Sequence, residues 1–217
     1  SQCRKRAYGQ FLNYFKKNID TELITLIHKI LINNSDSSLF LSSDELHSIA
    51  QFMNETEIDQ DSLNLLHLIA TKKEFKSMDD FVSIVPDLLI TLQIAEDEKK
   101  FLSILSLFEK IMNFNGFVTS IVNCNGQILL STALLRNSKI PLKLLSFILE
   151  NSMPTVQCSE FIFLFLKNFD LSDEENAINA LRMIKSLLKL DCSFHLFAKI
   201  PQNPLSLFLS SDVSDEV

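Results

Sequence analysis

The segment 127–152, QILLSTALLRNSKIPLKLLSFILENS, constrains the fold more than any other part of the chain. It contains two apolar runs with helical spacing, separated by the short polar stretch 137–139. Pro141 stands where the second run begins, and proline is well tolerated in the first turn of a helix. Both runs are too apolar for isolated helices, and the turn is too short to let them separate. The segment therefore predicts two packed helices, a unit that recurs along the chain in more or less altered form.

The composition favours an all-α fold. The 217 residues include only Gly 3 and Pro 5, whereas hairpin-rich β folds use glycine, proline and Asn-Gly pairs at their turns. Asn115-Gly116 and Asn125-Gly126 are the two Asn-Gly pairs, and Asn125-Gly126 lies between two helical patterns. A hydrophobic content of 47% is ample for a core.

Local signals place several helix boundaries. Asp20 is a candidate N-cap, and 172–175 has the spacing of a capping box. Pro86 predicts that 79–94 is divided into a short helix ending near residue 85 and a new helix starting near the proline. The stretch 123–126 ends a short helix with residues that tolerate the left-handed conformation. We also expect a first helix over 3–17.

Four strongly apolar helices recur at a similar interval. Leu66, Leu105, Leu145 and Leu181 are taken as equivalent core positions, which gives intervals of 39, 40 and 36 residues. Periods near 40 with two or three helices each are typical of armadillo and HEAT repeats. The four helices are Ser62–Ala70, Phe101–Met112, Pro141–Asn151 and Asn176–Leu188, preceded respectively by apolar helices at Leu46–Met53, Asp87–Ile94, Ile128–Leu135 and Glu160–Leu166.

The segment Gln127–Ser152 resembles an armadillo repeat, and the resemblance extends over about Leu46–Asp191. Asn115–Val122 corresponds to the short first helix of the family, Ile128–Leu135 to its second helix and Pro141–Leu149 to its third. Asn125-Gly126 precedes the second helix, as the glycine of the family does, although the other repeats lack this glycine. Many peptide-binding members have an asparagine late in the third helix, near the positions that Leu68 and Lys185 occupy here. The resemblance implies a right-handed α-solenoid of about four to five armadillo/HEAT-like repeats.

This interpretation predicts one helical-repeat domain over 1–217. N-terminal capping helices would occupy 1–42, the repeats 43–191 and a C-terminal cap 192–209, with a frayed acidic tail at 210–217. The alternative is an irregular α-helical bundle whose periodicity is accidental.

Charge and cysteine usage limit the classes of partner. The net charge is −7 and no long basic stripe is visible, so nucleic acid is an unexpected ligand. The longest nearly uncharged stretch, 114–135, is interrupted by polar residues and glycines, which argues against membrane insertion. The four cysteines form no C-x-x-C pair; they are interpreted as reduced thiols of an intracellular protein, cytoplasmic or nuclear, with disulfides in a secreted protein as the alternative.

The sequence contains no recognisable catalytic apparatus. There is no G-x-S-x-G, no H-E-x-x-H and no glycine-rich phosphate loop, and with three glycines a backbone phosphate cradle is essentially excluded. His28 and His67 lie within apolar helices, where packing explains them better than metal ligation. We therefore expect a protein that is not an enzyme and needs no cofactor or metal.

The expected function is that of a non-catalytic scaffold that binds a peptide or a partner helix on a curved helical surface. The positively charged candidates would suit an acidic peptide or helix, although each could equally be part of an ordinary solvated face. The alternative function is structural, as an oligomerisation segment of a larger solenoid, with the phenylalanines of 161–165 covered by a partner or another repeat. The candidate binding residues are Asn64, His67, Lys110, Lys143, Arg182 and Lys185.

Overall fold

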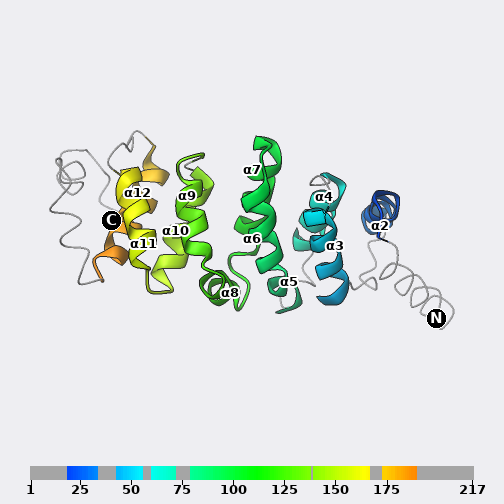
Figure 1. Ribbon diagram of the computed structural model, residues 1–217, viewed down its shortest axis with the longest axis horizontal. Coiled ribbons are helices and arrows are strands. Elements are labelled where there is room, and N and C mark those ends of the chain that lie inside the picture. Colours follow the sequence, from blue (N-terminus) through cyan, green and yellow to red (C-terminus); the bar gives the residue numbers. More distant parts are fainter. Residues whose placement is uncertain are drawn as a thin grey trace. The chain divides into compact units, whose positions relative to one another are not determined.

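A computed structural model describes residues 19–33, 43–55, 60–71, 79–137, 139–166 and 173–189. Every regular element in these ranges is a helix, which confirms the all-α prediction (Figure 1). Within the same ranges, no helix is both long and apolar enough to cross a membrane. The helices are α2 (Thr21–Asn33), α3 (Ser43–Glu55), α4 (Gln60–Thr71), α5 (Asp79–Ser83), α6 (Val85–Ile94), α7 (Glu98–Ile111), α8 (Phe117–Asn123), α9 (Gly126–Ala133), α10 (Lys139–Glu150), α11 (Val156–Leu166) and α12 (Glu174–Leu187).

The chain divides into two compact units. Unit 1 comprises Ser1–Ser120 and unit 2 comprises Ile121–Val217, so the division falls within α8. Each unit has its own buried core. The single-domain organisation over 1–217 stays a prediction.

Unit 1 is built from helices packed in two layers. Helix α4 packs against both α2 and α7, while α3 packs against α6. Helix α3 also contacts α4, and α6 contacts α7, so each pair forms a hairpin. Consecutive hairpins therefore stack like on like: the first helices, α3 and α6, pack together, and so do the second helices, α4 and α7. Aromatic rings complete the core next to this stack: Phe81 and Phe114 meet edge to face with centroids 6.2 Å apart, and Phe108 and Phe117 lie 6.1 Å apart.

Unit 2 repeats this packing scheme. Helices α9 and α10 form a hairpin, α11 packs on α9, and α12 packs on α10. Leu130, Leu145 and Ile162 are fully buried at these contacts. The predicted hairpin of 127–152 is therefore present, and it forms the centre of the helix contacts described for this unit.

Several local predictions are confirmed. The Asp20 carboxylate accepts a hydrogen bond from the backbone N–H of Leu23 at 2.8 Å, which caps α2. The helix is interrupted between α5 and α6, and Pro86 lies in the first turn of α6. Asn125 has φ 56 and ψ 23, the left-handed conformation, immediately before α9. Asparagine tolerates this conformation better than most residues, so a turn of only two residues, Cys124 and Asn125, separates α8 from α9.

Two sequence assignments need correction. The N-cap of α12 is Asp173, whose carboxylate accepts from the Asn176 N–H at 3.0 Å, whereas the sequence predicts a capping box that begins one residue earlier, at Ser172. Leu181 is only half-buried and is not equivalent to the fully buried Leu145, because α12 turns Ala180 and Ile184 toward the core instead. The predicted helix at 3–17, the C-terminal cap at 192–209 and the acidic tail lie outside the described residues.

Candidate interaction surfaces

The six predicted binding residues are divided between the two units. Asn64 and His67 lie on α4 and Lys110 on α7, all in unit 1, whereas Lys143 lies on α10, and Arg182 and Lys185 lie on α12, in unit 2. All six belong to helices that pack on each other in one layer of their unit. They are exposed except for His67 and Lys143, which are half-buried. The structure thus brings the six together as two groups of three.

In unit 1, His67 connects two helices. Its Nε2 lies 2.9 Å from the carbonyl oxygen of Ser103 on α7 and 3.1 Å from the Ser103 hydroxyl. Because a carbonyl oxygen only accepts, Nε2 carries the proton and Nδ1 is the unprotonated nitrogen. Nδ1 is buried and has no hydrogen-bond partner among the described residues. His67 therefore packs between α4 and α7 and joins them through Ser103.

The environment of His67 favours the neutral ring. Burial lowers the pKa of the imidazole below its usual value of 6.5, and the positive charge of Lys110 lowers it further. The hydrogen bond to Ser103 acts in the opposite direction and is the smaller effect. Neighbouring Asn64 accepts a hydrogen bond from the Gln60 side chain at 3.1 Å and remains exposed.

In unit 2, two of the predicted cations face carboxylates of the neighbouring helix. Lys143 Nζ lies 3.9 Å from Glu175 Oε1, and Arg182 Nε lies 3.7 Å from Glu150 Oε1. Both pairs are long and substantially exposed, so each contributes about 0–1 kcal/mol to stability. They nevertheless reduce the net positive charge that α10 and α12 offer to a partner. Sequence spacing alone did not reveal these pairs, because they join residues 32 positions apart.

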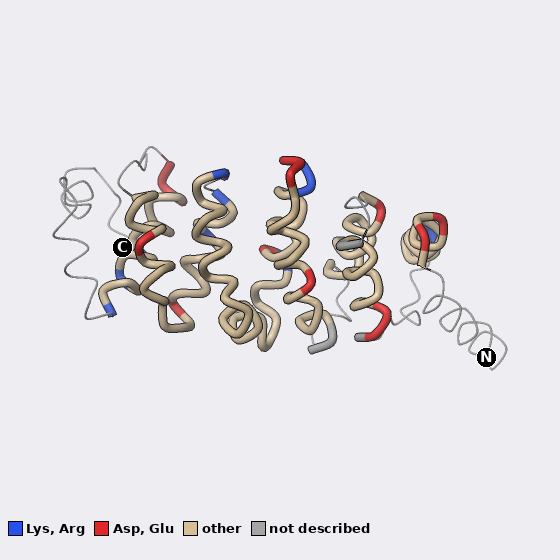
Figure 2. Tube along the Cα trace, viewed as in Figure 1, with Lys and Arg blue, Asp and Glu red and all other residues tan. Residues whose placement is uncertain are grey.

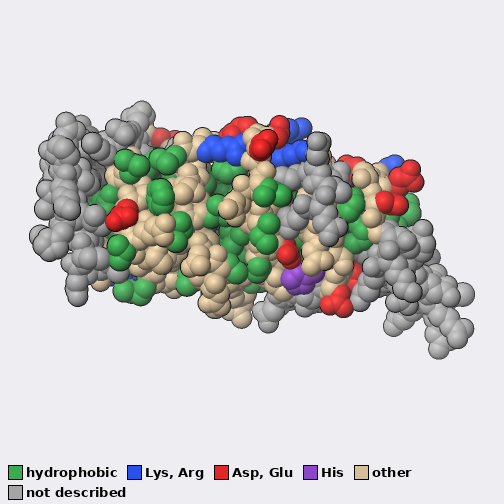
Figure 3. Space-filling model, in the orientation of Figure 1, with side chains coloured by type: hydrophobic (Ala, Val, Ile, Leu, Met, Phe, Trp, Pro, Cys, Tyr) green, Lys and Arg blue, Asp and Glu red, His purple; other side chains and the backbone are tan. Residues whose placement is uncertain are grey.

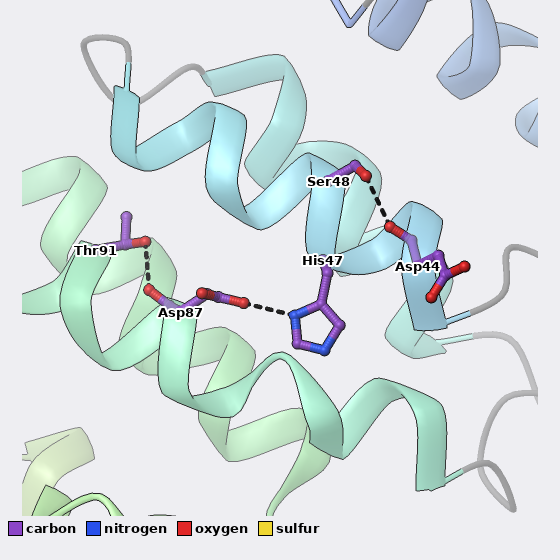
Figure 4. A network of polar contacts seen from close by, with 5 residues as sticks. All are labelled: Asp44, His47, Ser48, Asp87 and Thr91. Carbon is purple, nitrogen blue, oxygen red and sulfur yellow. Dashed lines mark hydrogen bonds and ion pairs between the residues drawn. The ribbon is translucent and has the colours of Figure 1, made fainter. Parts of the chain in front are cut away.

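A histidine–aspartate contact in unit 1 was missed at the sequence level. His47 Nδ1 lies 2.7 Å from Asp87 Oδ2 and joins α3 to α6 (Figure 4). On each side of the contact a hydroxyl is bonded back into its own helix: Ser48 to the Asp44 carbonyl and Thr91 to the Asp87 carbonyl, both at 2.8 Å. The 40 residues between His47 and Asp87 carry no local motif, so only the stacking of α3 on α6 could indicate this pair.

The described residues of the two units differ in charge, and Figure 2 shows the positions of these charges along the chain. Among the described residues, unit 1 contains thirteen acidic and four basic residues, a formal net charge of −9. Unit 2 contains five acidic and six basic residues in its described part, a net charge of +1. Over the full sequence the contrast is smaller: residues 1–120 carry a formal net charge of −5 and residues 121–217 carry −2, which together give the −7 of the chain.

The described residues hold no cluster of three or more His, Cys, Asp or Glu side chains that could bind a metal ion. The Cys158 thiol is buried, and burial raises its pKa to about 12, against a smaller lowering by the Ser131 hydroxyl. Such a thiol is a poor nucleophile at neutral pH. Cys124, by contrast, is exposed.

Comparisons with protein-family models, with curated proteins and with solved structures found no match to this chain.

Proposed function

We propose that this chain is a non-catalytic interaction scaffold of armadillo/HEAT-like repeats that binds a peptide or a partner helix. The observation that carries the proposal is the packing of like helices on like helices in both units. Such stacking is how helical-repeat proteins extend a continuous surface from one repeat to the next. An intracellular location, cytoplasmic or nuclear, belongs to the same proposal.

Polar contacts between stacked helices support a regular repeat in unit 1. The Thr25 hydroxyl donates to Asp61 Oδ2 at 2.7 Å between α2 and α4, and His67 contacts Ser103 between α4 and α7. The two residues of each pair are 36 positions apart in the sequence. The contact from α2 to α4 and the contact from α4 to α7 therefore join residues at the same sequence separation. A constant interval is expected when each hairpin occupies an equivalent position on the last.

The exposed surface of α10 and α12, the later helices of the pairs α9–α10 and α11–α12, is the proposed site for an acidic peptide and is named the second-helix surface of unit 2. Lys143, Arg182 and Lys185 lie on the adjacent helices α10 and α12. The carboxylates near Lys143 and Arg182 would be partly displaced when a more acidic partner binds. Affinity for such a partner should therefore depend strongly on salt.

Affinity capture with three forms of the chain tests this surface. The parent is compared with a Lys143→Gln/Arg182→Gln/Lys185→Gln variant and with a control of equal charge change, Lys29→Gln/Lys99→Gln/Lys100→Gln. Proteins recovered by the parent and the control, but lost with the first variant, would support the proposal. If the two variants recover the same proteins, the second-helix surface of unit 2 is not the binding site.

A specific observation also favours the structural alternative. Met153, Val156 and Leu164 are more than half exposed on or next to α11, although α11 is a strongly apolar helix. Exposed apolar side chains of this kind can be buried by self-association. Sedimentation velocity over a range of concentrations separates the two functions: a monomer favours the scaffold, and a concentration-dependent dimer favours the oligomerisation segment.

A further inference from the structure

The exposed face of α6 carries an apolar pair in an acidic surrounding. Asp87, Ile90 and Ile94 follow one another at i, i+3 and i+7, so they share one side of the helix. Ile90 is 51% exposed and Ile94 is 47% exposed, while Leu88 and Leu92 of the same helix are buried. Since a helix rises about 1.5 Å per residue, this row is about 10 Å long.

Carboxylates lie at both ends of the row. Asp87 begins it, and the contact with His47 holds this carboxylate beside α3, whose first turn carries the exposed Asp44. Beyond Ile94 the chain continues with Glu96-Asp97-Glu98, followed by Lys99 and Lys100. Figure 3 shows green side chains on one face of the molecule, with a purple histidine and red carboxylates near the lower edge and both red carboxylates and blue Lys or Arg side chains at the upper edge.

We propose that this α6 surface docks a cationic amphipathic segment of a partner protein. Apolar side chains of the segment would cover Ile90 and Ile94, and its Lys or Arg side chains would face the carboxylates at the two ends of the row. Charge determines this choice of occupant: carboxylates lie at both ends of the row, and residues 1–120 of unit 1 contain 17 acidic and 12 basic residues, a formal net charge of −5, which favours cations over nucleic acid and anionic membranes.

This surface is distinct from the second-helix surface of unit 2 and favours a partner of the opposite charge. It lies on the layer formed by α3 and α6, whereas Asn64, His67 and Lys110 lie on the other layer of the same unit. The two binding activities therefore respond to different substitutions. Loss of the acidic-peptide site would leave the α6 surface intact, and the reverse holds as well.

A labelled peptide of Leu and Lys, arranged as an amphipathic helix of about five turns and therefore about 18 residues, tests the proposal. Its binding to the full chain is followed by fluorescence anisotropy, next to a counterpart in which Glu replaces every Lys. We expect the Lys peptide to bind, the Glu peptide to bind at least about tenfold more weakly, and the affinity of the Lys peptide to fall as salt rises from about 50 to about 300 mM.

Two variants with equally exposed apolar residues locate the binding. Ile90→Ser/Ile94→Ser removes the proposed contacts, and Val156→Ser/Leu164→Ser removes two side chains on α11, each 53% exposed. We expect at least a tenfold loss of affinity for the first variant and less than a twofold change for the second. Equal losses, or no loss in either variant, would overturn the proposal.

A third variant keeps the test decisive if the serine substitutions disturb folding. Gln93 is exposed on α6 between the two isoleucines in sequence, so Gln93→Arg adds a cation beside the row without removing a core contact. We expect several-fold weaker binding of the Lys peptide through charge repulsion, with unchanged circular dichroism. Unchanged affinity in this folded variant would exclude the α6 surface.

Discussion

The side-chain amide of Gln127 donates to the hydroxyl of Ser152 at 2.9 Å and thereby ties the start of α9 to the end of the α9–α10 hairpin. The same amide nitrogen lies 3.1 Å from the carbonyl oxygen of Met153, and the amide oxygen accepts from the Thr155 N–H at 3.3 Å. Gln127 is 1% exposed, so its polar atoms are satisfied by protein. The connection from α10 to α11 is thus held from the inside of unit 2.

Replacing Gln127 by alanine should destabilise unit 2. The change removes three hydrogen bonds and leaves the Thr155 N–H and the Met153 carbonyl without this partner, which we expect to cost about 2–4 kcal/mol. Urea unfolding followed by circular dichroism measures the loss. Gln157→Ala, at an exposed position of α11, is the matched control and should change stability by less than about 0.5 kcal/mol. Similar values for the two variants would contradict this role of Gln127.

Acidification should destabilise unit 1 through His67. Its pKa in the folded chain lies below the usual 6.5, so the unfolded chain takes up the proton first as the pH falls. The contribution of the neutral ring is complete above about pH 6.5 and is lost as the pH falls from there toward the lower pKa of the folded state. His67→Gln, which can still donate to Ser103, should show a shallower decline of unfolding free energy between pH 7 and pH 5.

Asn64→Ala, one turn earlier on α4, is the control for this experiment and should keep the steeper pH dependence of the parent. NMR titration of the His67 ring provides an independent measurement. An apparent pKa above 6.5 in the folded chain would show that burial does not dominate at this site.

Leu145 and Leu181 should differ in their sensitivity to truncation. Leu145 is fully buried, so Leu145→Ala removes a core contact and leaves a cavity, at a cost of about 2–5 kcal/mol. Leu181 is half-buried, and Leu181→Ala should cost about 1 kcal/mol. Thermal unfolding of the two variants tests the revised register of α12. Equal losses would restore Leu181 as an equivalent core position.

The two described thiols of unit 2, Cys124 and Cys158, should differ in reactivity. At pH 8, Cys158 remains protonated because its pKa is raised to about 12, and its burial blocks access. Iodoacetamide treatment of the native chain followed by peptide mapping should therefore modify Cys124 and leave Cys158 intact. In urea both should react. Modification of Cys158 in the native chain at the rate of Cys124 would contradict the buried position.

The sequence by itself predicted which segments are helical and where many of them end. Four local signals carry this information, and each acts within about one helical turn: the apolar spacing, the carboxylate of Asp20, the proline at 86 and the pair Asn125-Gly126. The interval near 40 residues further predicts which helices are equivalent, and this repeat assignment stays a prediction. These features depend on chain chemistry over short distances, so they can be identified before any tertiary contact is known.

Only the tertiary structure decided which side chains meet. His47 and Asp87 are 40 residues apart, and Lys143 and Glu175 are 32 apart, so their contacts exist only because like helices stack. In the same packing, α12 is oriented so that Leu181 lies partly outside the core. Carboxylates lie beside two of the predicted cations. Sequence periodicity specifies the apolar face of a helix, whereas the rotation of that helix against its neighbour is fixed by side-chain packing between distant segments.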